Sequence, residues 1–315
     1  MDSVDAVILW DLGFDYQAPL STTNRRPNLR RIADGLGIDR KTVSSRVRKM
    51  EEGGFIGYYQ TYPNIAAAGM KASSYLLPFK EPAAKREAVN KLKLVKEILR
   101  IDECLNSLRF TVVYDKQPDL DRTLRLILTL TASEPLRLYD FQLPRVRREL
   151  GETDWRIMKS LRYDALKPSR KIAEELGISS RAVNYHLERL IKERALLVAP
   201  VFDMKHVAGT ILYGLIFQID EDDGKRPRAI EKITDTFKQN SFCRVVGHSG
   251  TVMFMMFTDR IAEPEENYLN AKAMEGVTNV HMDFIRRTHD CSEQIDACLE
   301  EQIVRKRRKV PEIEA

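Results

Sequence analysis

Residues 180–185 contain the side-chain types that read base edges in double-stranded DNA. Arg181 and Asn184 can each form two hydrogen bonds with a base, arginine with guanine and asparagine with adenine. Ser180 and Tyr185 suit contacts to phosphate and sugar groups, and Arg189 adds a positive charge one helical turn later. This chemistry requires a helix that turns these five side chains toward solvent.

The surrounding residues predict such a helix. Val183, Leu187 and Leu190 recur at helical spacing, so they should face a core and leave the polar side chains outside. Ser179 is expected to cap this helix over residues 180–193. A shorter helix should precede it at 170–176, capped by Ser169 and ended by Gly177 in the left-handed conformation. Helix, glycine turn and second helix form a helix-turn-helix.

The same signature stands 140 positions earlier in the chain. Residues 29–43 match residues 169–183, with Asn28 and Asp39 as expected caps. The buried stripe would be Val43, Val47 and Met50. The outward residues would be Arg40, Lys41, Ser44, Ser45 and Arg48, with Arg46 at the edge. Because this face is more basic and has no base-reading amide, we expect copy one to supply phosphate affinity and copy two to supply sequence readout.

The repeat extends past the two recognition helices. Apolar, strand-like exits at 55–69 and 195–209 both end in glycine at the same offset, which favours a tandem duplication. The second half then predicts the strand–helix order β-α-β-β-α-β of a ferredoxin-like domain. Its elements are expected at 211–219, 228–238, 242–246, 252–257, 263–274 and 277–285. The first half has drifted, with elements expected at 72–79, 83–99, 108–114, 119–130 and 136–143.

The predicted fold class is therefore α+β, with two winged helix-turn-helix domains alternating with two ferredoxin-like domains. The expected divisions are 1–64 (with an inserted loop at 13–27), 65–148, 149–205, 206–290 and a basic C-terminal tail at 291–315. The loop carries Arg25 and Arg26 and the tail carries Arg305 to Lys309. Either basic segment could contact phosphates or remain a solvated surface.

This organisation resembles the Lrp/AsnC (feast–famine) family of prokaryotic transcription regulators, carried twice in one chain. The resemblance rests on residues 176–190, on the exit to Gly209, and on the strand-loop-strand around Gly247. It implies an internal pseudo-dimer that binds double-stranded DNA, and a small-molecule effector near the interface between the two halves. The acidic Gly-Asp-x-Asp loop typical of the family is replaced here by Gly247, His248, Ser249 and Gly250. This loop is the candidate effector site, and a plain strand connection is the alternative.

Two other functions stay open beside the regulator. Some paired Lrp-like domains resemble siroheme decarboxylases, which would call for histidine, arginine and aromatic residues clustered on the strands of the second domain. Here only Cys243, Arg244 and His248 sit together. A third possibility is an interaction adaptor that no longer contacts DNA. Because the chain shows no P-loop, dinucleotide or nucleophile-elbow motif and no structural zinc spacing, we expect no catalytic residues, no enzyme activity, no cofactor and no metal.

The composition limits the partners and the cellular location that we expect for the protein. With 315 residues, a net charge of +5 and a pI near 8.9, the chain permits a polyanionic partner without requiring one. The four cysteines form no CxxC pair, and neither a signal peptide nor a bilayer-spanning apolar stretch is visible. We therefore expect reduced thiols, a cytoplasmic location and no membrane partner. Homo-oligomers through exposed sheet or helix surfaces stay open.

Overall fold

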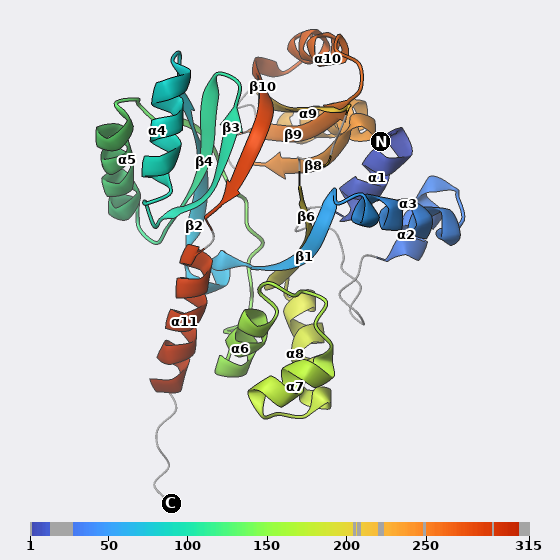
Figure 1. Ribbon diagram of the computed structural model, residues 1–315, viewed down its shortest axis with the longest axis vertical. Helices are drawn as coiled ribbons and strands as arrows, with labels where there is room; N and C mark the ends of the chain where they lie inside the picture. Colours follow the sequence, from blue (N-terminus) through green and yellow to red (C-terminus); the bar gives the residue numbers. More distant parts are fainter. Residues whose placement is uncertain are drawn as a thin grey trace, which may run out of the picture.

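The computed structural model describes residues 2–12, 28–203, 206, 209–219, 224–247, 250–291 and 293–308. Two helix-turn-helix units project from a body made of one large sheet flanked by helices (Figure 1). The predicted α+β class, with winged helix-turn-helix and ferredoxin-like parts in alternation, is confirmed.

Unit 1 consists of α1 (Ser3–Leu12), α2 (Leu29–Leu36) and α3 (Arg40–Glu52). The predicted caps are present: Asn28 Oδ1 accepts from the Arg31 N–H at 3.2 Å, and Asp39 Oδ1 accepts from the Lys41 N–H at 2.7 Å. Gly37 ends α2 with φ at 65°, a conformation that glycine adopts without a steric penalty.

Unit 2 consists of α6 (Glu152–Ser160), α7 (Ser169–Leu176) and α8 (Ser180–Lys192). Gly177 takes the expected left-handed conformation with φ at 68°, and Ser179 Oγ caps α8 by accepting from the Ala182 N–H. The predicted cap at Ser169 is wrong, because Ser169 is the first helical residue and Pro168 occupies the cap position. Pro168 has no side-chain acceptor to offer the first N–H groups of α7.

A two-stranded antiparallel ribbon joins the two units. It pairs β1 (Ile56–Pro63), which follows α3, with β6 (Leu196–Phe202), which follows α8. These strands are the wings of the two units, so each wing is completed by the other half of the chain. A short 3-10 helix, η1 (Ile65–Ala68), leads from β1 into the large sheet.

Eight strands from both halves form that sheet, in the order β5-β2-β4-β3-β10-β7-β9-β8. The first-half strands are β2 (Lys71–Pro78), β3 (Ile98–Cys104), β4 (Ser107–Tyr114) and β5 (Leu136–Asp140). The second-half strands are β7 (Ile211–Ile219), β8 (Ser241–Val246), β9 (Thr251–Thr258) and β10 (Val277–Asp290). The long strand β10 pairs with β7 and then with β3, so it joins the halves. A bridge between Phe141 and Gly247 brings the two sheet ends together, and we call the result the barrel.

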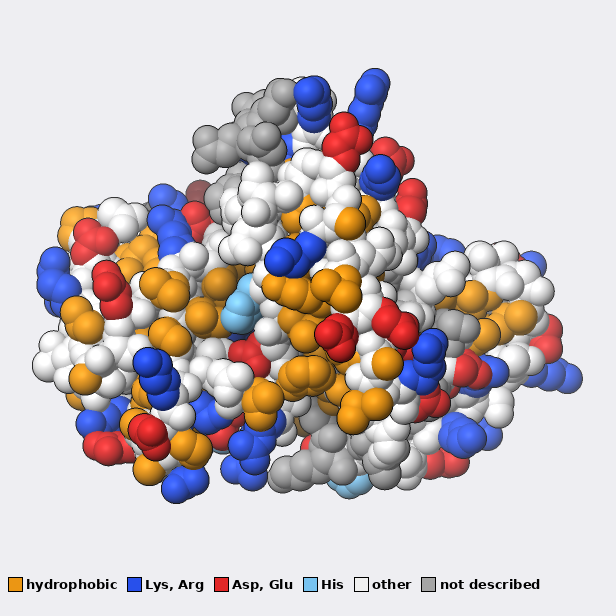
Figure 2. Space-filling model, turned by 90° about the horizontal axis from the view of Figure 1, so that it is seen from above, with side chains coloured by type: hydrophobic (Ala, Val, Ile, Leu, Met, Phe, Trp, Pro, Cys, Tyr) orange, Lys and Arg blue, Asp and Glu red, His pale blue; other side chains and the backbone are white. Residues whose placement is uncertain are grey.

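Helices cover the outer face of the barrel. First-half strands pack against α4 (Pro82–Leu92) and α5 (Gln117–Thr131). Second-half strands pack against α9 (Arg226–Phe237), η3 (Lys238–Asn240) and α10 (Glu263–Lys272). Seen from the α10 end, hydrophobic side chains gather near the middle of the face, with charged side chains around them (Figure 2).

Three predicted element boundaries in the barrel need correction. The helix expected at 83–99 ends at Leu92, and residues 98–104 form the missed strand β3. Val89, Leu92, Val95 and Ile98 keep a helix-like spacing across the turn, which hid the boundary; Leu94, 84% exposed, marks it. The last strand continues to Asp290 because β3 pairs with its second part, and the strand expected at 136–143 ends at Asp140.

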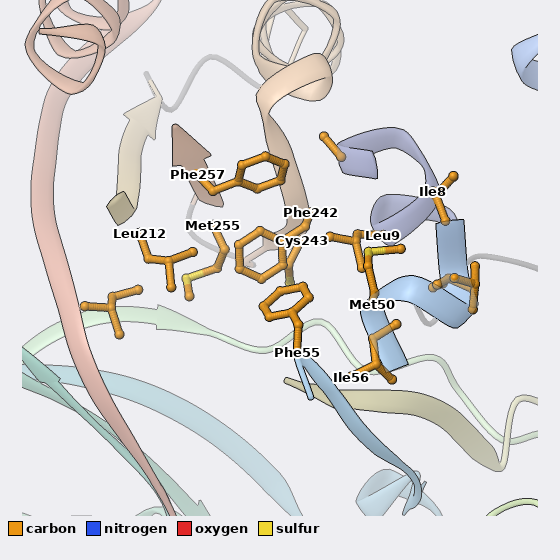
Figure 3. Close-up of a cluster of buried hydrophobic side chains, with 14 of the residues drawn as sticks. Ile8, Leu9, Met50, Phe55, Ile56, Leu212, Phe242, Cys243, Met255 and Phe257 are labelled. Atoms are coloured by element: carbon orange, nitrogen blue, oxygen red, sulfur yellow. The ribbon is translucent and has the colours of Figure 1, made fainter. Parts of the chain in front are cut away.

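The two units are held in place differently. The core of unit 1 continues into the barrel, where Phe55, Phe242 and Phe257 lie between Leu9 and Leu212 (Figure 3). Unit 2 packs instead against the C-terminal helix α11 (Glu293–Arg308), whose Ile295, Leu299 and Ile303 join its core. Much of the expected tail is therefore a docked helix. None of the helices in the described ranges is long and apolar enough to cross a bilayer.

Candidate functional sites: two recognition helices and a barrel cavity

The outward face of α8 presents most of the predicted reading side chains. Ser180, Arg181, Asn184 and Tyr185 are exposed, and Tyr185 is 60% exposed despite its size. The opposite face buries the predicted Val183, Leu187 and Leu190 in the core of unit 2. Because one face is fully used for packing, the other is held in a fixed orientation toward solvent.

Arg189 lies apart from these four side chains. It is half-buried, and its Nη2 donates to Asp154 Oδ1 and Oδ2 at 2.8 and 2.7 Å. His186 Nδ1 lies 2.7 Å from the same carboxylate, which also accepts from the Gly151 N–H. Asp154 is fully buried in α6. Its contacts with Arg189 and His186 therefore hold the recognition helix α8 against α6.

Asp154 is a positioning residue that the sequence did not single out. The signal was available: His186 and Arg189 are three residues apart, so they project from the same side of α8. Only the packing of α6 against α8 shows that an acid faces them.

In unit 1, Arg40, Lys41, Ser45 and Arg48 are exposed on α3, and Ser44 is half-buried. Arg46, expected at the edge of this face, turns inward instead. Its Nη1 donates to Asp5 Oδ1 in α1 at 2.8 Å and to Asp2 Oδ2, just before α1, at 2.9 Å. Asp5 and Arg46 thus make the same connection in unit 1 that Asp154 makes in unit 2.

The candidate effector loop is described only at its ends. Gly250 has φ at 73°, and a Cβ on Gly247 would lie 2.6 Å from Tyr139 Cβ, so both glycines meet local backbone requirements. This favours the strand-connection alternative for Gly247 and Gly250. His248 and Ser249 lie outside the described residues, as do the 13–27 loop with Arg25 and Arg26, and Lys309.

A cavity of about 290 Å³ lies inside the barrel, between the two halves of the chain. Its walls come from β3, β4, β5, β8, β9 and β10, and the β1–β6 ribbon and α11 close one end. Its lining includes Arg100, Asp102, Arg109, Tyr139, Phe242, Cys243, Arg244, Met253, Met255, Thr288 and Asp290.

The first half supplies a charged wall to this cavity, formed by Arg100, Asp102 and Arg109. Arg109 donates to Asp102 Oδ2 from Nε at 3.0 Å and from Nη2 at 2.6 Å, while Arg100 Nε donates to Oδ1 at 2.8 Å. Thr288 Oγ1 donates to the same carboxylate at 2.7 Å. Burial alone would raise the pKa of Asp102, but the two guanidinium groups outweigh it and hold that pKa below its ordinary value.

The second half supplies an apolar wall, formed by Cys243, Met253 and Met255. Arg109 Nη1 lies 2.8 Å from Met253 Sδ, and Nη2 lies 3.6 Å from Met255 Sδ.

The decarboxylase alternative called for histidine, arginine and aromatic residues on the strands of the second half. It considered Cys243 and Arg244 in the second half; both line the cavity, and the Arg244 guanidinium lies 5.8 Å from the Trp10 ring centroid. The cluster itself comes from β3 and β4 of the first half. Arg100 and Asp102 escaped notice because β3 was partly hidden in the predicted helix and otherwise left unassigned.

Comparisons with known proteins bear on both sites. Residues 150–194, which contain unit 2, match the family described as winged helix-turn-helix DNA-binding. None of the curated proteins matches the sequence. The structure of the siroheme decarboxylase NirDL covers 96% of this chain and 99% of its own, at 16% identity and a TM-score of 0.56. NirDL in complex with an iron-uroporphyrin III analogue matches equally.

Two further structures match less than half of the chain. Escherichia coli AsnC covers 44% of this chain and 93% of its own, at 13% identity and a TM-score of 0.35. LrpA of Mycobacterium tuberculosis covers 44% and 90%, at 22% identity and a TM-score of 0.27. The expectation that the chain is not an enzyme is contradicted, because two structures that cover 96% of it are those of an enzyme. The predicted resemblance to Lrp/AsnC regulators, as two such units in one chain, is confirmed.

Proposed function

We propose that this chain is a sequence-specific, DNA-binding transcription regulator in which one polypeptide supplies both halves of a pseudo-dimer. The observation that carries the proposal is the exposed set Arg181, Asn184 and Tyr185 on α8. A buried carboxylate, Asp154, fastens this helix to α6. Because the helix is held in place, its backbone needs little rearrangement when these side chains meet base edges in a major groove.

The arrangement of the two units supports a two-part DNA site. The β1–β6 ribbon ties unit 1 to unit 2, and each unit is also packed on a rigid neighbour, unit 1 on β8 and unit 2 on α11. Two recognition helices in a fixed relation favour two half-sites at one spacing, as in dimeric helix-turn-helix proteins. Insertion of five base pairs between the half-sites should therefore abolish tight binding, because it turns one half-site to the opposite side of the helix.

The first experiment is selection of bound sequences from random duplex DNA, followed by affinity measurements over a range of salt concentrations. Each phosphate contact lowers the logarithm of affinity by about 0.9 per logarithmic unit of salt. Arg181→Glu should abolish binding to the selected site. Arg122→Glu is the matched control, since it makes the same charge change on α5, where the Arg122 side chain is exposed and pairs with Asp119 on its own helix.

Two results would refute the regulator proposal. One is a selection that enriches no sequence. The other is equal binding by the two charge-reversal variants, which would favour the adaptor alternative.

A decarboxylase of carboxylated tetrapyrroles is the second candidate. It is favoured by the cavity between the halves, where Arg100 and Arg109 can face carboxylates, and by the full-length similarity to a siroheme decarboxylase. The test adds iron uroporphyrin III to the full chain and follows its absorption spectrum and its mass. Loss of carboxyl groups that is abolished in Arg109→Met would support this candidate, whereas an unchanged spectrum and mass would remove it.

Homo-oligomers and a cytoplasmic location remain predictions. The molar mass in solution, measured by light scattering with and without the selected DNA, tests the first. Location requires imaging or fractionation of the source cells.

A further inference from the structure

A cluster of basic side chains lies where α11 ends beside unit 2. Lys306 of α11 donates from Nζ to Glu149, and Arg307 donates from Nε to Glu152 Oε1 at 2.7 Å. These two ion pairs join the last turn of α11 to the stretch of chain that leads into α6. We call the seven cationic side chains of these two stretches the basic patch: Arg145, Arg147, Arg148, Arg305, Lys306, Arg307 and Arg308.

The basic patch carries more positive charge than its acidic neighbours offset. Glu149 and Glu152 are engaged by Lys306 and Arg307. The other five arginines of the patch are exposed, and within the described part of the chain they form no ion pair. Seven cations and two acids leave a net charge of +5, equal to that of the whole chain. The rest of the chain is therefore neutral on balance.

Helix electrostatics explains only part of the patch. Cations in the last turn of α11 suit the negative end of its dipole. Arg147 and Arg148, in contrast, lie just before Gly151, the N-cap of α6, where the dipole is positive and acidic side chains are favoured. Because these two arginines also lie near the cations of α11, a nearby anion would stabilise this end of unit 2.

The patch lies on one side of the pseudo-dimer. Figure 1 shows α11 running away from the barrel beside α6, with unit 1 on the opposite side of unit 2. Asp154 in the first turn of α6 contacts His186 and Arg189, so the end of α6 that the patch flanks is packed directly on the recognition helix. In unit 1, the position before α1 is held by Asp2, which pairs with Arg46.

We propose that the basic patch binds the phosphate backbone of the duplex DNA that continues past the half-site of unit 2, on the side away from unit 1. This inference rests on the proposed DNA binding by α8 and extends it to base pairs that neither recognition helix reads. Six of the seven cations are arginines, and a guanidinium can donate two parallel hydrogen bonds to phosphate oxygens. Such contacts add affinity without sequence preference.

A lipid surface is the other polyanion that a basic patch can meet, and the patch favours DNA over it. Stable attachment to lipid adds buried apolar side chains to the attraction between charges. Val146, between the arginines of the first stretch, packs on the core of unit 2 instead. Val304, 43% exposed, is the one apolar side chain in 304–308. The patch therefore has little of the apolar surface that a membrane anchor needs.

The first experiment measures the affinity of the full chain for three duplexes that contain the selected site. One ends at both half-sites, the second continues about ten base pairs past the half-site of unit 2, and the third continues equally past that of unit 1. The half-site that loses its sequence preference in Arg181→Ala identifies unit 2. We expect the second duplex to bind more tightly than the first, and the third to gain little.

Salt dependence measures the number of contacts in this gain. With two phosphate contacts from the patch, the second duplex should have a salt slope steeper by about 2, so its advantage should shrink about tenfold between about 50 and 200 mM salt. No gain from the second duplex, or equal gains from the second and the third, would overturn the proposal.

Variants test the assignment to these side chains. The patch variant replaces four arginines that form no ion pair with a described residue: Arg147→Gln, Arg148→Gln, Arg305→Gln and Arg308→Gln. It should lose the gain from the second duplex and keep the sequence preference at the site itself. The matched control replaces four exposed arginines on helices that cover the barrel and should keep the gain: Arg86→Gln, Arg122→Gln, Arg125→Gln and Arg228→Gln. Both variants should unfold no lower than a few degrees below the wild-type chain, since the replaced side chains are exposed. A gain that survives in the patch variant would contradict the assignment.

Two outcomes separate this proposal from the proposed function. Tight binding to the selected site with no gain from the second duplex would refute the patch alone. If no sequence is selected, a duplex of about 30 base pairs of arbitrary sequence takes its place, and the patch variant should bind it with a salt slope lower by about 2 than the control variant. Equal slopes would then overturn the proposal.

Vesicles of phosphatidylcholine with phosphatidylserine test the lipid alternative. The wild-type chain and the patch variant should bind them equally weakly. Vesicle binding that depends on the patch, without a patch-dependent gain on DNA, would assign the patch to a lipid surface and overturn the proposal.

Discussion

Units 1 and 2 share one internal plan but are anchored by different neighbours. In unit 1, the core merges with the barrel, and Trp10 of α1 stacks on Phe254 of β9 with ring centroids 6.1 Å apart. In unit 2, α6 packs on α11, a helix that follows the second ferredoxin-like part alone. The comparison shows that the helix-turn-helix was conserved between the repeats while its attachment changed.

The ion pairs that join the helices within each unit also differ between the two units. Asp5 and Arg46 join α1 to α3 in unit 1, with side chains 14% and 32% exposed. Asp154 joins α6 to α8 in unit 2 and is fully buried between His186 and Arg189. Unit 2 therefore depends on its carboxylate more than unit 1 does.

The largest expected effect comes from removal of α11. A chain that ends at Cys291 loses three buried side chains, Ile295, Leu299 and Ile303, from the core of unit 2. At about 1.5–3 kcal/mol for each, unit 2 should lose about 5–9 kcal/mol of stability. Hydrogen exchange should show faster opening of α6, α7 and α8 with α1, α2 and α3 unchanged. Equal loss of protection in both units would contradict the separate anchoring.

The second effect compares the two fastening carboxylates. Asp154→Asn should cost about 3 kcal/mol of unfolding free energy, because Arg189 is left without its buried anionic partner. Asp5→Asn should cost about 1 kcal/mol or less, since Asp5 and Arg46 are partly exposed. Urea unfolding of the two variants measures both values. Equal costs for the two substitutions would show that burial of Asp154 does not make unit 2 more dependent on its carboxylate.

The third effect separates the roles of the recognition helices. Arg181→Ala with Asn184→Ala should lower affinity for the selected site about 100-fold, since each base contact contributes about 1–3 kcal/mol, and leave non-specific binding nearly intact. Arg40→Ala with Lys41→Ala should weaken binding to all sequences and reduce the salt slope by about 2. Gel shifts at several salt concentrations distinguish the two patterns. Identical patterns would show that the units read DNA in the same way.

The smallest effect concerns the two cavity walls in acid. The pKa of Asp102 in the folded chain lies below its ordinary value of 3.8, so the stability it contributes is complete above that value. This contribution falls as the pH drops below about 3.8 and Asp102 takes up a proton. Between about pH 5 and pH 2, the wild-type chain should lose about 1 kcal/mol more than the Asp102→Val, Arg109→Met variant. Urea unfolding of both chains across this pH range measures the difference. Parallel curves of unfolding free energy against pH would show that ionised Asp102 adds no such stability.

The prediction of the fold succeeded where local signals were strong. Gly37, Gly177, Asp39 and Ser179 mark helix ends through backbone geometry and caps, which depend on neighbouring residues only. The prediction of the first ferredoxin-like part failed at β3, because the apolar spacing of the preceding helix continues beyond the residue where that helix ends.

The candidate sites divide in the same way. The exposed residues of α8 were predicted from a helical period, which assigns a face to each side chain. Arg46 was placed at the edge of the outward face of α3, and Arg189 on the outward face of α8, but each turns toward an acid on another helix. The charged wall could not be foreseen, because Arg109 meets Met253 only when strands from both halves enclose one interior.

By itself, the sequence determined the duplication, because the same residue pattern recurs 140 positions later. It also determined the two helix-turn-helix units and the faces of their recognition helices, since these follow from spacing within a few helical turns. Tertiary structure alone decided which acids fasten those helices, that α11 serves unit 2, and that one cavity has a charged and an apolar wall. The physical reason is that these features join residues from about 30 to almost 190 positions apart, and such contacts depend on how the whole chain folds together.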